Sequence, residues 1–285
     1  MSLNARARAE VIRRIQEEEE RARERLGRIR HKIAVLSVKG GVGKSFLVAN
    51  IAVALAIKGK QVGVLDADVH GPSIPRALGL QGLALVAGPE GIVPALGPSG
   101  VKVVSIGLML SDERAAVVWR GPMKTAFIRQ VLSMTAWGEL DYLLVDLPPG
   151  TGDEQLTIAH LISDLDGLLV VTIPSILSSS IASKAGEFAK SLKVRILGVV
   201  ENMSYFRCPS CGAIHRVFGE GGGRALAEAL GAPLLATLPL DPLAASSMDK
   251  GTPIVLEFPE IELSKSIVKL ASVLEEIVEE DASCT

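Results

Sequence analysis

From residue 32 onward, short runs that are apolar at every position alternate with longer segments in which apolar residues recur at helical spacing. Strands buried on both faces need apolar side chains throughout, and such strands are typical of parallel sheets covered by helices. The alternation therefore predicts an α/β fold with a doubly wound, mostly parallel sheet and helices on both faces. The predicted strands are IAVLSV, QVGVLDAD, YLLVDLPP, GLLVVTIP and RILGVV, which begin at residues 33, 61, 142, 167 and 195.

Three segments depart from this alternation. Residues 5 to about 30 alternate Arg and Glu blocks around a thin apolar line, which is typical of a solvated helix rather than a core element. Residues 80–106 are rich in Gly and Pro, which predicts a hairpin insertion or edge strands. Residues 261–280 place apolar side chains at helical intervals beside an acid-rich face, which predicts a packed terminal helix. We therefore expect a charged helical extension over residues 1–30 and one α/β domain over residues 31–285.

Composition narrows the classes of partner. The chain has 285 residues, with 30 Lys and Arg against 32 Asp and Glu, so its formal net charge is -2. This balance offers no general attraction to nucleic acid or to an anionic membrane, and we expect neither as a partner. The most apolar helical segment, FLVANIAVALAI, is too short to cross a bilayer and contains Asn50. The first residues lack the apolar stretch of a secretory signal, so we expect a cytoplasmic protein.

A glycine-rich segment, KGGVGKS at residues 39–45, lies between the first predicted strand and the next helical segment. Its glycines let backbone N–H groups converge on phosphate oxygens at the electropositive start of the helix. Lys44 can reach the β- and γ-phosphates, and Ser45 can ligate Mg²⁺. The segment predicts a site for ATP and Mg²⁺, although Val38 stands where the general motif begins with Gly. The predicted nucleotide-binding residues of this loop are Lys39, Gly40, Gly41, Val42, Gly43, Lys44, Ser45 and Phe46.

Carboxylates end two of the predicted strands. The segment VLDADVHGPSIP carries Asp66 and Asp68, and the segment LLVDLPPGTGD carries Asp146. Phosphoryl transfer to water needs a carboxylate near Mg²⁺ and a group that orients the attacking water. We assign Asp146 to the metal through a water, Asp68 to the nucleophile, and Asp66 to a supporting role. The alternative is that Asp66 or Asp153 merely caps a helix or turn.

Lys39 precedes the glycine pair, where its side chain cannot easily fold back onto its own nucleotide but could reach phosphates held by a second subunit. The loop resembles that of the deviant Walker A class of P-loop ATPases, whose members pair face to face around two nucleotides. The resemblance implies that Lys39 is the signature lysine acting across the interface. Together with the assignments above, it gives a catalytic set of Lys39, Lys44, Asp68 and Asp146. The alternative for Lys39 is a solvated surface lysine.

Two of the three cysteines, Cys208 and Cys211, lie three positions apart in NMSYFRCPSCGAIH, residues 202–215. A closed zinc or iron–sulfur site usually needs four ligands, so this pair supplies half of one. An odd number of cysteines argues against a disulfide framework and leaves metal binding or redox chemistry for the close pair. We interpret Cys284, next to the last residue, as a bystander.

The motifs KGGVGKS, DADVHGPSIP, DLPPGTGD, ENMSYFRCPSCG, FGEGGG and PLD, in this order, resemble the Mrp/ApbC/Nbp35 family of ATPases, which are thought to assemble and carry [4Fe–4S] clusters. The resemblance covers about residues 31–275. It implies switch roles for Asp68 and Asp146, and a cluster held by Cys208 and Cys211. The chain departs from the family pattern at the residue after Ser45, where a small hydroxyl residue is usual. The resemblance also implies contacts with the nucleotide base from Asn202, Pro239 and Asp241.

A twofold axis between two copies would supply the missing ligands. Two CxxC loops that meet there give four thiolates for a [4Fe–4S] cluster, and the same closure brings Lys39 toward the opposite nucleotide. We therefore expect a homodimeric, ATP-hydrolysing carrier that holds a labile cluster between its subunits and transfers it to apoproteins. Apo iron–sulfur proteins and cluster-assembly scaffolds are the expected partners.

Other chemistries remain open for the cysteine pair. Zinc could occupy the same Cys₄ site, or bind Cys208 and Cys211 together with His215. The CxxC segment could instead be a redox pair or a metal-free knuckle. For the whole chain, the alternatives are a MinD/ParA-like positioning ATPase and a dimeric ATPase with structural zinc.

Overall fold

The computed structural model describes residues 3–68, 71–109, 121–162, 164–174 and 178–282, and no helix in these ranges is both long and apolar enough to cross a membrane. The strands are β1 (Ile29–Leu36), β2 (Val62–Asp66), β3 (Val86–Gly88), β4 (Gly91–Val93), β5 (Ala95–Leu96), β6 (Lys102–Ser105), β7 (Leu140–Asp146), β8 (Gly167–Thr172), β9 (Ile196–Arg207), β10 (Ile214–His215) and β11 (Leu234–Pro239). The α-helices are α1 (Leu3–Leu26), α2 (Lys44–Ile57), α3 (Ile74–Ala77), α4 (Gly121–Met134), α5 (Asp153–Leu161), α6 (Ser178–Leu192), α7 (Gly222–Leu230), α8 (Pro242–Lys250), α9 (Ile254–Glu257) and α10 (Glu262–Ala282). Short 3₁₀ helices are η1 (Pro98–Gly100) and η2 (Ile106–Leu108).

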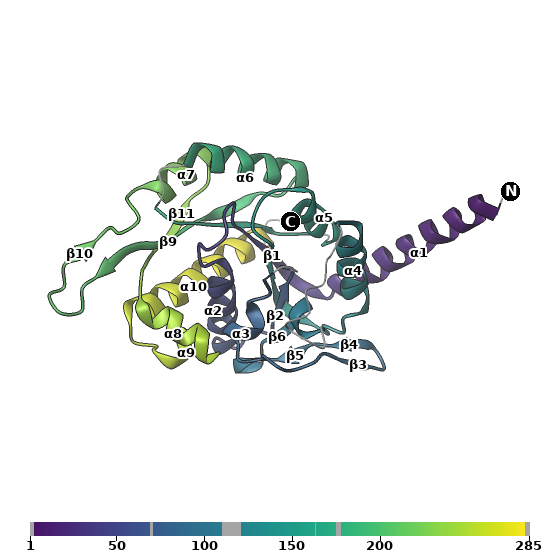
Figure 1. Cartoon of the computed structure of the whole chain (residues 1–285), viewed down its shortest axis with the longest axis horizontal. Coiled ribbons are helices and arrows are strands. Elements are labelled where there is room, and N and C mark those ends of the chain that lie inside the picture. The colour runs from purple at the N-terminus through teal and green to yellow at the C-terminus, as the bar shows by residue number, and fades with distance from the viewer. Residues whose placement is uncertain (1–2, 69–70, 110–120, 163, 175–177, 283–285) are drawn as a thin grey trace.

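One large sheet forms the centre of the molecule (Figure 1). Its strand order is β10–β9–β8–β1–β7–β2–β6–β5, with β11 paired to β9. The pairs β1–β7, β1–β8, β2–β6, β2–β7, β8–β9 and β9–β11 are parallel, whereas β5 and β10 join antiparallel. The predicted doubly wound, mostly parallel α/β fold is confirmed. The all-apolar runs correspond to β1, β2, β7, β8 and β9.

Alternate side chains of the central strands enter two different hydrophobic cores. Ile33 and Val35 of β1 pack in the core that contains α2 and α10. Ala34 and Leu36 pack in the core that contains α4, α5 and α6. Burial on both faces explains why these strands are apolar at every position. The predicted packed terminal helix is also confirmed, because α10 packs against α2 with Leu270 buried.

The Gly- and Pro-rich segment, residues 80–106, forms small strands at one side of the sheet. Strands β3 and β4 pair antiparallel as a separate two-stranded sheet, and β5 adds an antiparallel edge to β6. The predicted hairpin insertion with edge strands is therefore confirmed. The insertion lies on the β6 side, away from β9 and β10.

Helix α1 differs from the expectation at its C-terminal end. Its N-terminal part projects from the molecule (Figure 1), and Val11 is 57% exposed. Its last turns instead contact α4 and bury Ala22 and Leu26. The prediction of a solvated helix is wrong for these turns, because two apolar residues four positions apart share a helix face and reach the core. The sheet begins at Ile29, inside the range 1–30 expected for the extension.

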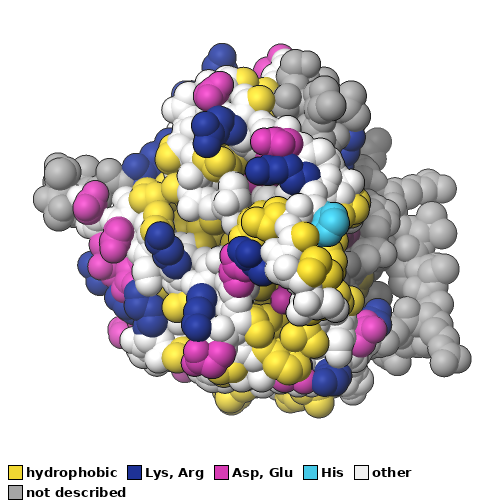
Figure 2. All heavy atoms as spheres, turned by 90° about the vertical axis from the view of Figure 1, so that its left-hand side faces the viewer, with side chains coloured by type: hydrophobic (Ala, Val, Ile, Leu, Met, Phe, Trp, Pro, Cys, Tyr) yellow, Lys and Arg dark blue, Asp and Glu magenta, His cyan; other side chains and the backbone are white. Residues whose placement is uncertain are grey.

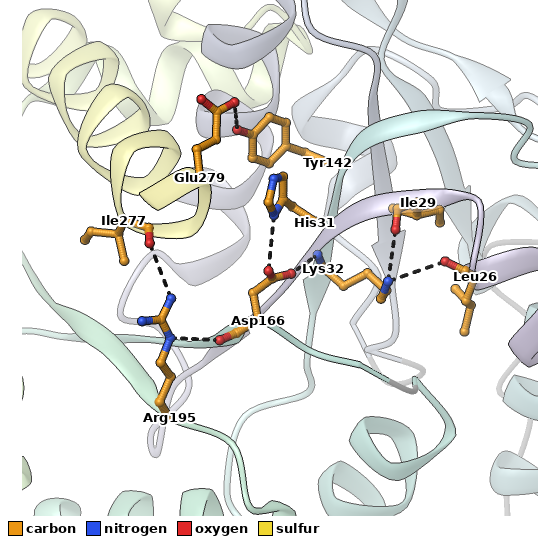
Figure 3. A network of polar contacts seen from close by, with 9 residues as sticks. All are labelled: Leu26, Ile29, His31, Lys32, Tyr142, Asp166, Arg195, Ile277 and Glu279. Atoms are coloured by element: carbon orange, nitrogen blue, oxygen red, sulfur yellow. Dashed lines mark hydrogen bonds and ion pairs between the residues drawn. The ribbon is translucent and has the colours of Figure 1, made fainter. Parts of the chain in front are cut away.

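A polar network lies at the start of β1, at the opposite end of that strand from the glycine-rich loop (Figure 3). The Lys32 ammonium donates to the carbonyl of Leu26, the last residue of α1, at 3.4 Å and to that of Ile29, the first residue of β1, at 3.0 Å. Asp166 accepts a 2.6 Å hydrogen bond from the Lys32 backbone and lies 3.1 Å from Nδ1 of His31. Burial lowers the pKa of Lys32, and the charge of Asp166 opposes this shift. The network joins α1, β1 and the residue before β8.

We predict that Leu26→Ala lowers the free energy of unfolding by about 2–4 kcal/mol, because it leaves a cavity between α1 and α4. The matched variant Val11→Ala, on the exposed part of the same helix, should change it by less than about 0.5 kcal/mol. Urea unfolding followed by circular dichroism measures both. Equal effects of the two substitutions would contradict the division of α1 into an exposed part and a packed part.

Candidate functional site

The carboxyl ends of β1, β7 and β2 meet at one edge of the sheet, and each delivers a predicted site residue. The glycine-rich loop follows β1, while Asp146 and Asp66 are the last residues of β7 and β2. In the register of the sheet, Asp146 pairs with both Val35 and Asp66. The two carboxylates therefore lie on adjacent strands beside the loop, at the edge where open α/β sheets bind ligands.

The glycine-rich loop leads directly into α2, which begins at Lys44. Gly41 and Gly43 have φ angles of +77° and +83°, a left-handed conformation that side chains rarely adopt. A Cβ atom at position 43 would lie 2.3 Å from Nδ2 of Asn202, so this position also requires a close approach to β9. Asn202 in turn donates a 2.9 Å hydrogen bond to the carbonyl of Val42. The loop is thus held against β9, with the electropositive start of α2 at its end.

Lys44 and Ser45 both contact Asp146. The Lys44 ammonium donates to one carboxylate oxygen, and the Ser45 hydroxyl donates to the other. Lys44 and Asp146 are buried, with 6% and 0% of their side chains exposed. Burial raises the pKa of Asp146, whereas the charge of Lys44 and the hydrogen bonds from Lys44 and Ser45 oppose that rise. The predicted phosphate ligand, the predicted Mg²⁺ ligand and the predicted switch carboxylate therefore form one cluster.

Asp66 supports the turn that follows β2. Its carboxylate accepts hydrogen bonds from the Ser105 hydroxyl at 2.9 Å, the Asp68 amide at 3.2 Å and the Ile74 amide at 3.4 Å. Burial and the nearby charge of Asp146 raise the pKa of Asp66 to about 8. The contact with Ile74 agrees with the alternative of a helix or turn cap, because Ile74 begins α3, whereas the supporting role in the reaction centre stays a prediction. The side chain of Asp153 lies outside the described part of the structure.

A cavity of about 300 Å³ lies over the glycine-rich loop, bounded by Asp68 on one side and Pro149 on the other. Asp68 is half-buried, and its carboxylate accepts a 3.3 Å hydrogen bond from the Gly71 amide. Lys39 is exposed and does not line this cavity, so its predicted role across an interface and the alternative of a solvated lysine both stay open. The loop residues that do line it are Gly40, Gly41, Val42, Gly43, Lys44, Ser45 and Phe46.

A second cavity, of about 260 Å³, adjoins the first. Gly43, Phe46 and Met248 line both, so the two cavities meet at these residues. The second cavity is mostly apolar and contains the predicted base-contact residues Asn202, Pro239 and Asp241. The first cavity, over the glycine-rich loop, is termed the phosphate cavity, and the more apolar second cavity is termed the base cavity, because adjoining cavities of this kind suit the two parts of a nucleotide.

Sequence reasoning missed several residues of the base cavity. Met203 and Leu240 are neighbours of predicted residues, and Met248 comes from α8. Met203 has a φ of +55°, which is uncommon for a residue other than glycine and turns the chain next to Asn202. No motif marks Met248, because its position depends on the packing of α8. Asp241 also has a structural role, since its carboxylate accepts a 2.9 Å hydrogen bond from the Leu243 amide and caps α8.

The two cysteines lie at the turn of a hairpin formed by β9 and β10, which extends from the body of the molecule (Figure 1). The Cys208 amide donates to the carbonyl of Ala213 at 2.9 Å, and the Gly212 amide donates to the carbonyl of Cys208 at 2.8 Å. The amides of Cys211 and Ser210 donate to the Cys208 thiolate and lower the pKa of Cys208. The turn therefore favours the thiolate form that metals bind.

The hairpin narrows the alternatives for the cysteine pair. A redox CxxC usually opens a helix, whereas this pair lies in a β-turn. Among the residues that the structure describes, no three His, Cys, Asp or Glu side chains are close enough together to hold a metal ion. The proposed set of Cys208, Cys211 and His215 is therefore not formed, because His215 pairs with Phe206 further along the hairpin. Cys284 lies outside the described residues.

Contacts with α10 tie the base of the hairpin to the body. The Tyr205 hydroxyl donates to Glu262 at 2.7 Å, and Nε of Arg207 donates to the other carboxylate oxygen at 3.1 Å. Hydrogen bonds from Arg207 and Tyr205 lower the pKa of Glu262, so it stays ionised. Burial and the carboxylate of Glu262 raise the pKa of Tyr205 to about 12, so the phenol remains a donor.

Comparison with known proteins agrees with this site. The family of NUBPL iron-transfer P-loop NTPases, within the ParA group, matches residues 28–275. The chain belongs to this family. The iron–sulfur cluster carrier protein of Saccharolobus solfataricus is 49% identical over 251 residues, which cover 88% of this chain and 85% of that protein. The human cytosolic Fe–S cluster assembly factor NUBP2 is 42% identical over 263 residues, which cover 91% and 96%.

One solved structure that is similar to the chain contains a bound nucleotide. The nucleotide-binding protein of Archaeoglobus fulgidus, determined in complex with ADP, is 40% identical to the chain and superposes with a TM-score of 0.73. The match covers 86% of this chain and 98% of that one. The family expected from the motifs is therefore confirmed, and the P-loop of the chain is that of a nucleoside-triphosphatase family.

We predict that the buried Asp66 makes the protein less stable as pH rises. Its pKa is about 8 in the folded state and 3.8 in the reference state, so between these values the folded protein binds more protons. The free energy of unfolding should then fall with pH by up to about 1.4 kcal/mol per unit, and Asp66→Asn should reduce this slope. Urea titrations from pH 5 to 7 measure it, with the surface variant Asp249→Asn as control. Parallel profiles for wild type and Asp66→Asn would contradict the prediction.

Proposed function

We propose that the chain is an ATP-hydrolysing, homodimeric carrier that holds a labile [4Fe–4S] cluster between two subunits and transfers it to apoproteins. The observation that carries this proposal is the half-set of ligands at Cys208 and Cys211, for which the described residues supply no third partner. The two cysteines lie at the turn of the β9–β10 hairpin, and Asn202 of the same strand β9 lines the base cavity. The printed names of the relatives, iron–sulfur cluster carrier and assembly factor, support a cluster as the cargo.

Hydrolysis requires that the γ-phosphate be held, that its charge be balanced and that a water be aimed at it. In this proposal the loop amides and Lys44 would hold phosphate oxygens, while Ser45 and Asp146 would hold Mg²⁺, the latter through water, to balance the phosphate charge. Asp68, which borders the phosphate cavity, orients the attacking water. Since Lys44 pairs with Asp146 in the structure, it must exchange a carboxylate for a phosphate when ATP binds. After that exchange, Lys44 and the loop amides would meet the charge that develops on the γ-phosphate, which lowers a phosphoryl-transfer barrier.

Lys39 completes the opposite active site in this proposal. Its exposure and its absence from the lining of its own phosphate cavity support a role across the interface. The twofold axis that brings Lys39 to the partner's nucleotide also brings the two hairpins together. One contact between subunits would then assemble both the hydrolytic centre and the cluster site.

The surface around the cysteines supports pairing of two hairpins. Figure 2 views the molecule from the hairpin side, where hydrophobic side chains gather. Ile214, Val217 and Phe218 are 53%, 59% and 43% exposed close to the cysteines in sequence. Apolar groups exposed together mark an interaction surface more often than a free one. A second hairpin would cover them while it supplies two further thiolates for the cluster.

We further infer that the partners are apo iron–sulfur proteins and cluster-assembly scaffolds, in the cytoplasm. The name of the human relative, a cytosolic Fe–S cluster assembly factor, supports both statements. The net charge of -2 supports the exclusion of nucleic acid and membranes as partners. 

We predict that Lys44→Ala lowers the rate of ATP hydrolysis at least about 100-fold, because it removes a preorganised charge from the transition state. Phosphate release measures the rate, and circular dichroism checks the fold. The control is Lys250→Ala, a surface lysine on α8 that pairs with Glu257. Hydrolysis at the wild-type rate by a folded Lys44→Ala protein would place the active centre elsewhere.

We predict that Cys208→Ser with Cys211→Ser abolishes iron binding after anaerobic reconstitution with iron and sulfide. The wild type should bind about four iron and four sulfide ions per dimer, with the absorbance of a [4Fe–4S] cluster. Cys284→Ser is the matched control and should bind the same amount as the wild type. Undiminished iron in the double variant would refute the cluster assignment, and zinc in place of iron in the purified protein would favour a structural metal.

A further inference from the structure

Strand β9 runs from the base cavity to the cysteine hairpin. Asn202 lines the base cavity, and Cys208 follows the last residue of the same strand, Arg207. The pairing of β9 with β8 ends at Glu201, and its pairing with β11 ends at Tyr205. Among the residues that the structure describes, β9 pairs beyond Tyr205 with β10 alone. The hairpin therefore leaves the sheet without support from a neighbouring strand of the body.

Glu262 supplies the support that the sheet lacks. Its two carboxylate oxygens accept hydrogen bonds from the Tyr205 hydroxyl at 2.7 Å and from Nε of Arg207 at 3.1 Å. Within the described parts of the chain, these are the side-chain polar contacts that join the base of the hairpin to the body. Because Glu262 is the first residue of α10, its charge also lies at the favourable end of that helix.

The contacts of Glu262 with Tyr205 and Arg207 form a clamp, and this clamp lies next to the base cavity. Leu263, the next residue after Glu262, lines the base cavity. A third cavity, of about 430 Å³, separates the hairpin base from α8 and is lined by Arg207, Pro209 and Glu262 among others. The turn at residues 239–242 lines both the base cavity and this third cavity. The backbone amide of Leu240 in this turn donates a 2.7 Å hydrogen bond to the carbonyl of Tyr205.

A base that enters its cavity therefore contacts the same turn and the same end of α10 that hold the hairpin. The side chains of Arg207 and Glu262 are 48% and 44% exposed, so their ion pair adds little to overall stability. A weak contact of this kind can still select one orientation of an otherwise unsupported hairpin, because the alternatives differ little in free energy.

We propose that Glu262 is a positioning residue that fixes the cysteine hairpin relative to the base cavity. A nucleotide whose base occupies that cavity then controls the accessibility of Cys208 and Cys211. The proposal deepens the proposed function and rests on it, because it concerns how the cluster ligands are presented. Glu262 lines neither the phosphate cavity nor the base cavity, so the proposal gives a role to a side chain outside both.

The test uses the metal-free, full-length protein at a concentration where light scattering shows a monomer. Iodoacetamide modifies the thiols, and mass spectrometry of peptides reports Cys208 and Cys211 separately from Cys284. In the wild type, saturating ADP with Mg²⁺ should slow the modification of Cys208 and Cys211 about fivefold or more. In Glu262→Gln the affinity for ADP should stay within about twofold of the wild type, while the effect of ADP on these thiols falls below about twofold.

Two further variants separate positioning from general damage. Glu260→Gln removes an exposed ion pair with Lys265 near the same helix start and should respond to ADP as the wild type does. Tyr205→Phe keeps the ion pair of Arg207 with Glu262 and should retain part of the response. A full ADP response in Glu262→Gln, or none in a wild type that binds ADP, overturns the proposal. Neither result bears on iron binding, which the cysteine double variant tests by itself.

Discussion

The contact of Lys44 and Ser45 with the carboxylate of Asp146 is the interaction on which the rest of the site depends. Lys44 of α2 and Asp146 of β7 meet there with almost no exposure to solvent, and the half-buried Ser45 of α2 donates to the second carboxylate oxygen. Removing one partner would leave a buried charge unpaired, at a cost of about 3–5 kcal/mol. The contact therefore holds the start of α2 and the end of β7 in register. In the proposed function, it also keeps the two residues assigned to triphosphate and metal beside the carboxylate assigned to the switch.

Much of this arrangement follows from local sequence. The parallel sheet is predictable because strands buried on both faces need uninterrupted apolar runs, and β1, β7 and β8 have them. The loop before Lys44 is predictable because positive φ angles at Gly41 and Gly43 restrict those positions to glycine. Since strand order places β1 between β7 and β8, the carboxyl end of β7 falls beside that loop. Asp146 therefore reaches Lys44 although 102 residues separate them in the chain.

Other features depend on packing that no local pattern records. The apolar residues at the end of α1 could face solvent or a neighbour, and only the position of α4 decides between the two. Met248 enters the base cavity because α8 is capped and oriented by Asp241. The cysteine spacing predicts a turn and a half-set of ligands, but not that the turn stands at the end of an extended hairpin. That placement arises because β9 continues past the ends of β8 and β11.

The close approach of Gly43 to Asn202 has a mechanical consequence. Because Gly43 has no Cβ, the side chain of Asn202 can approach the phosphate-binding loop closely and donate a 2.9 Å hydrogen bond to the Val42 carbonyl. A rotation of β9 about this contact would have Asn202 near the pivot and the sulfur atoms at the far end. Six extended residues span about 20 Å, so a rotation of about 10° at the pivot would displace the sulfurs by about 3.5 Å. A movement of that size exceeds a metal–sulfur bond length of about 2.3 Å, so a small rotation beside the loop would be a large displacement at the thiols.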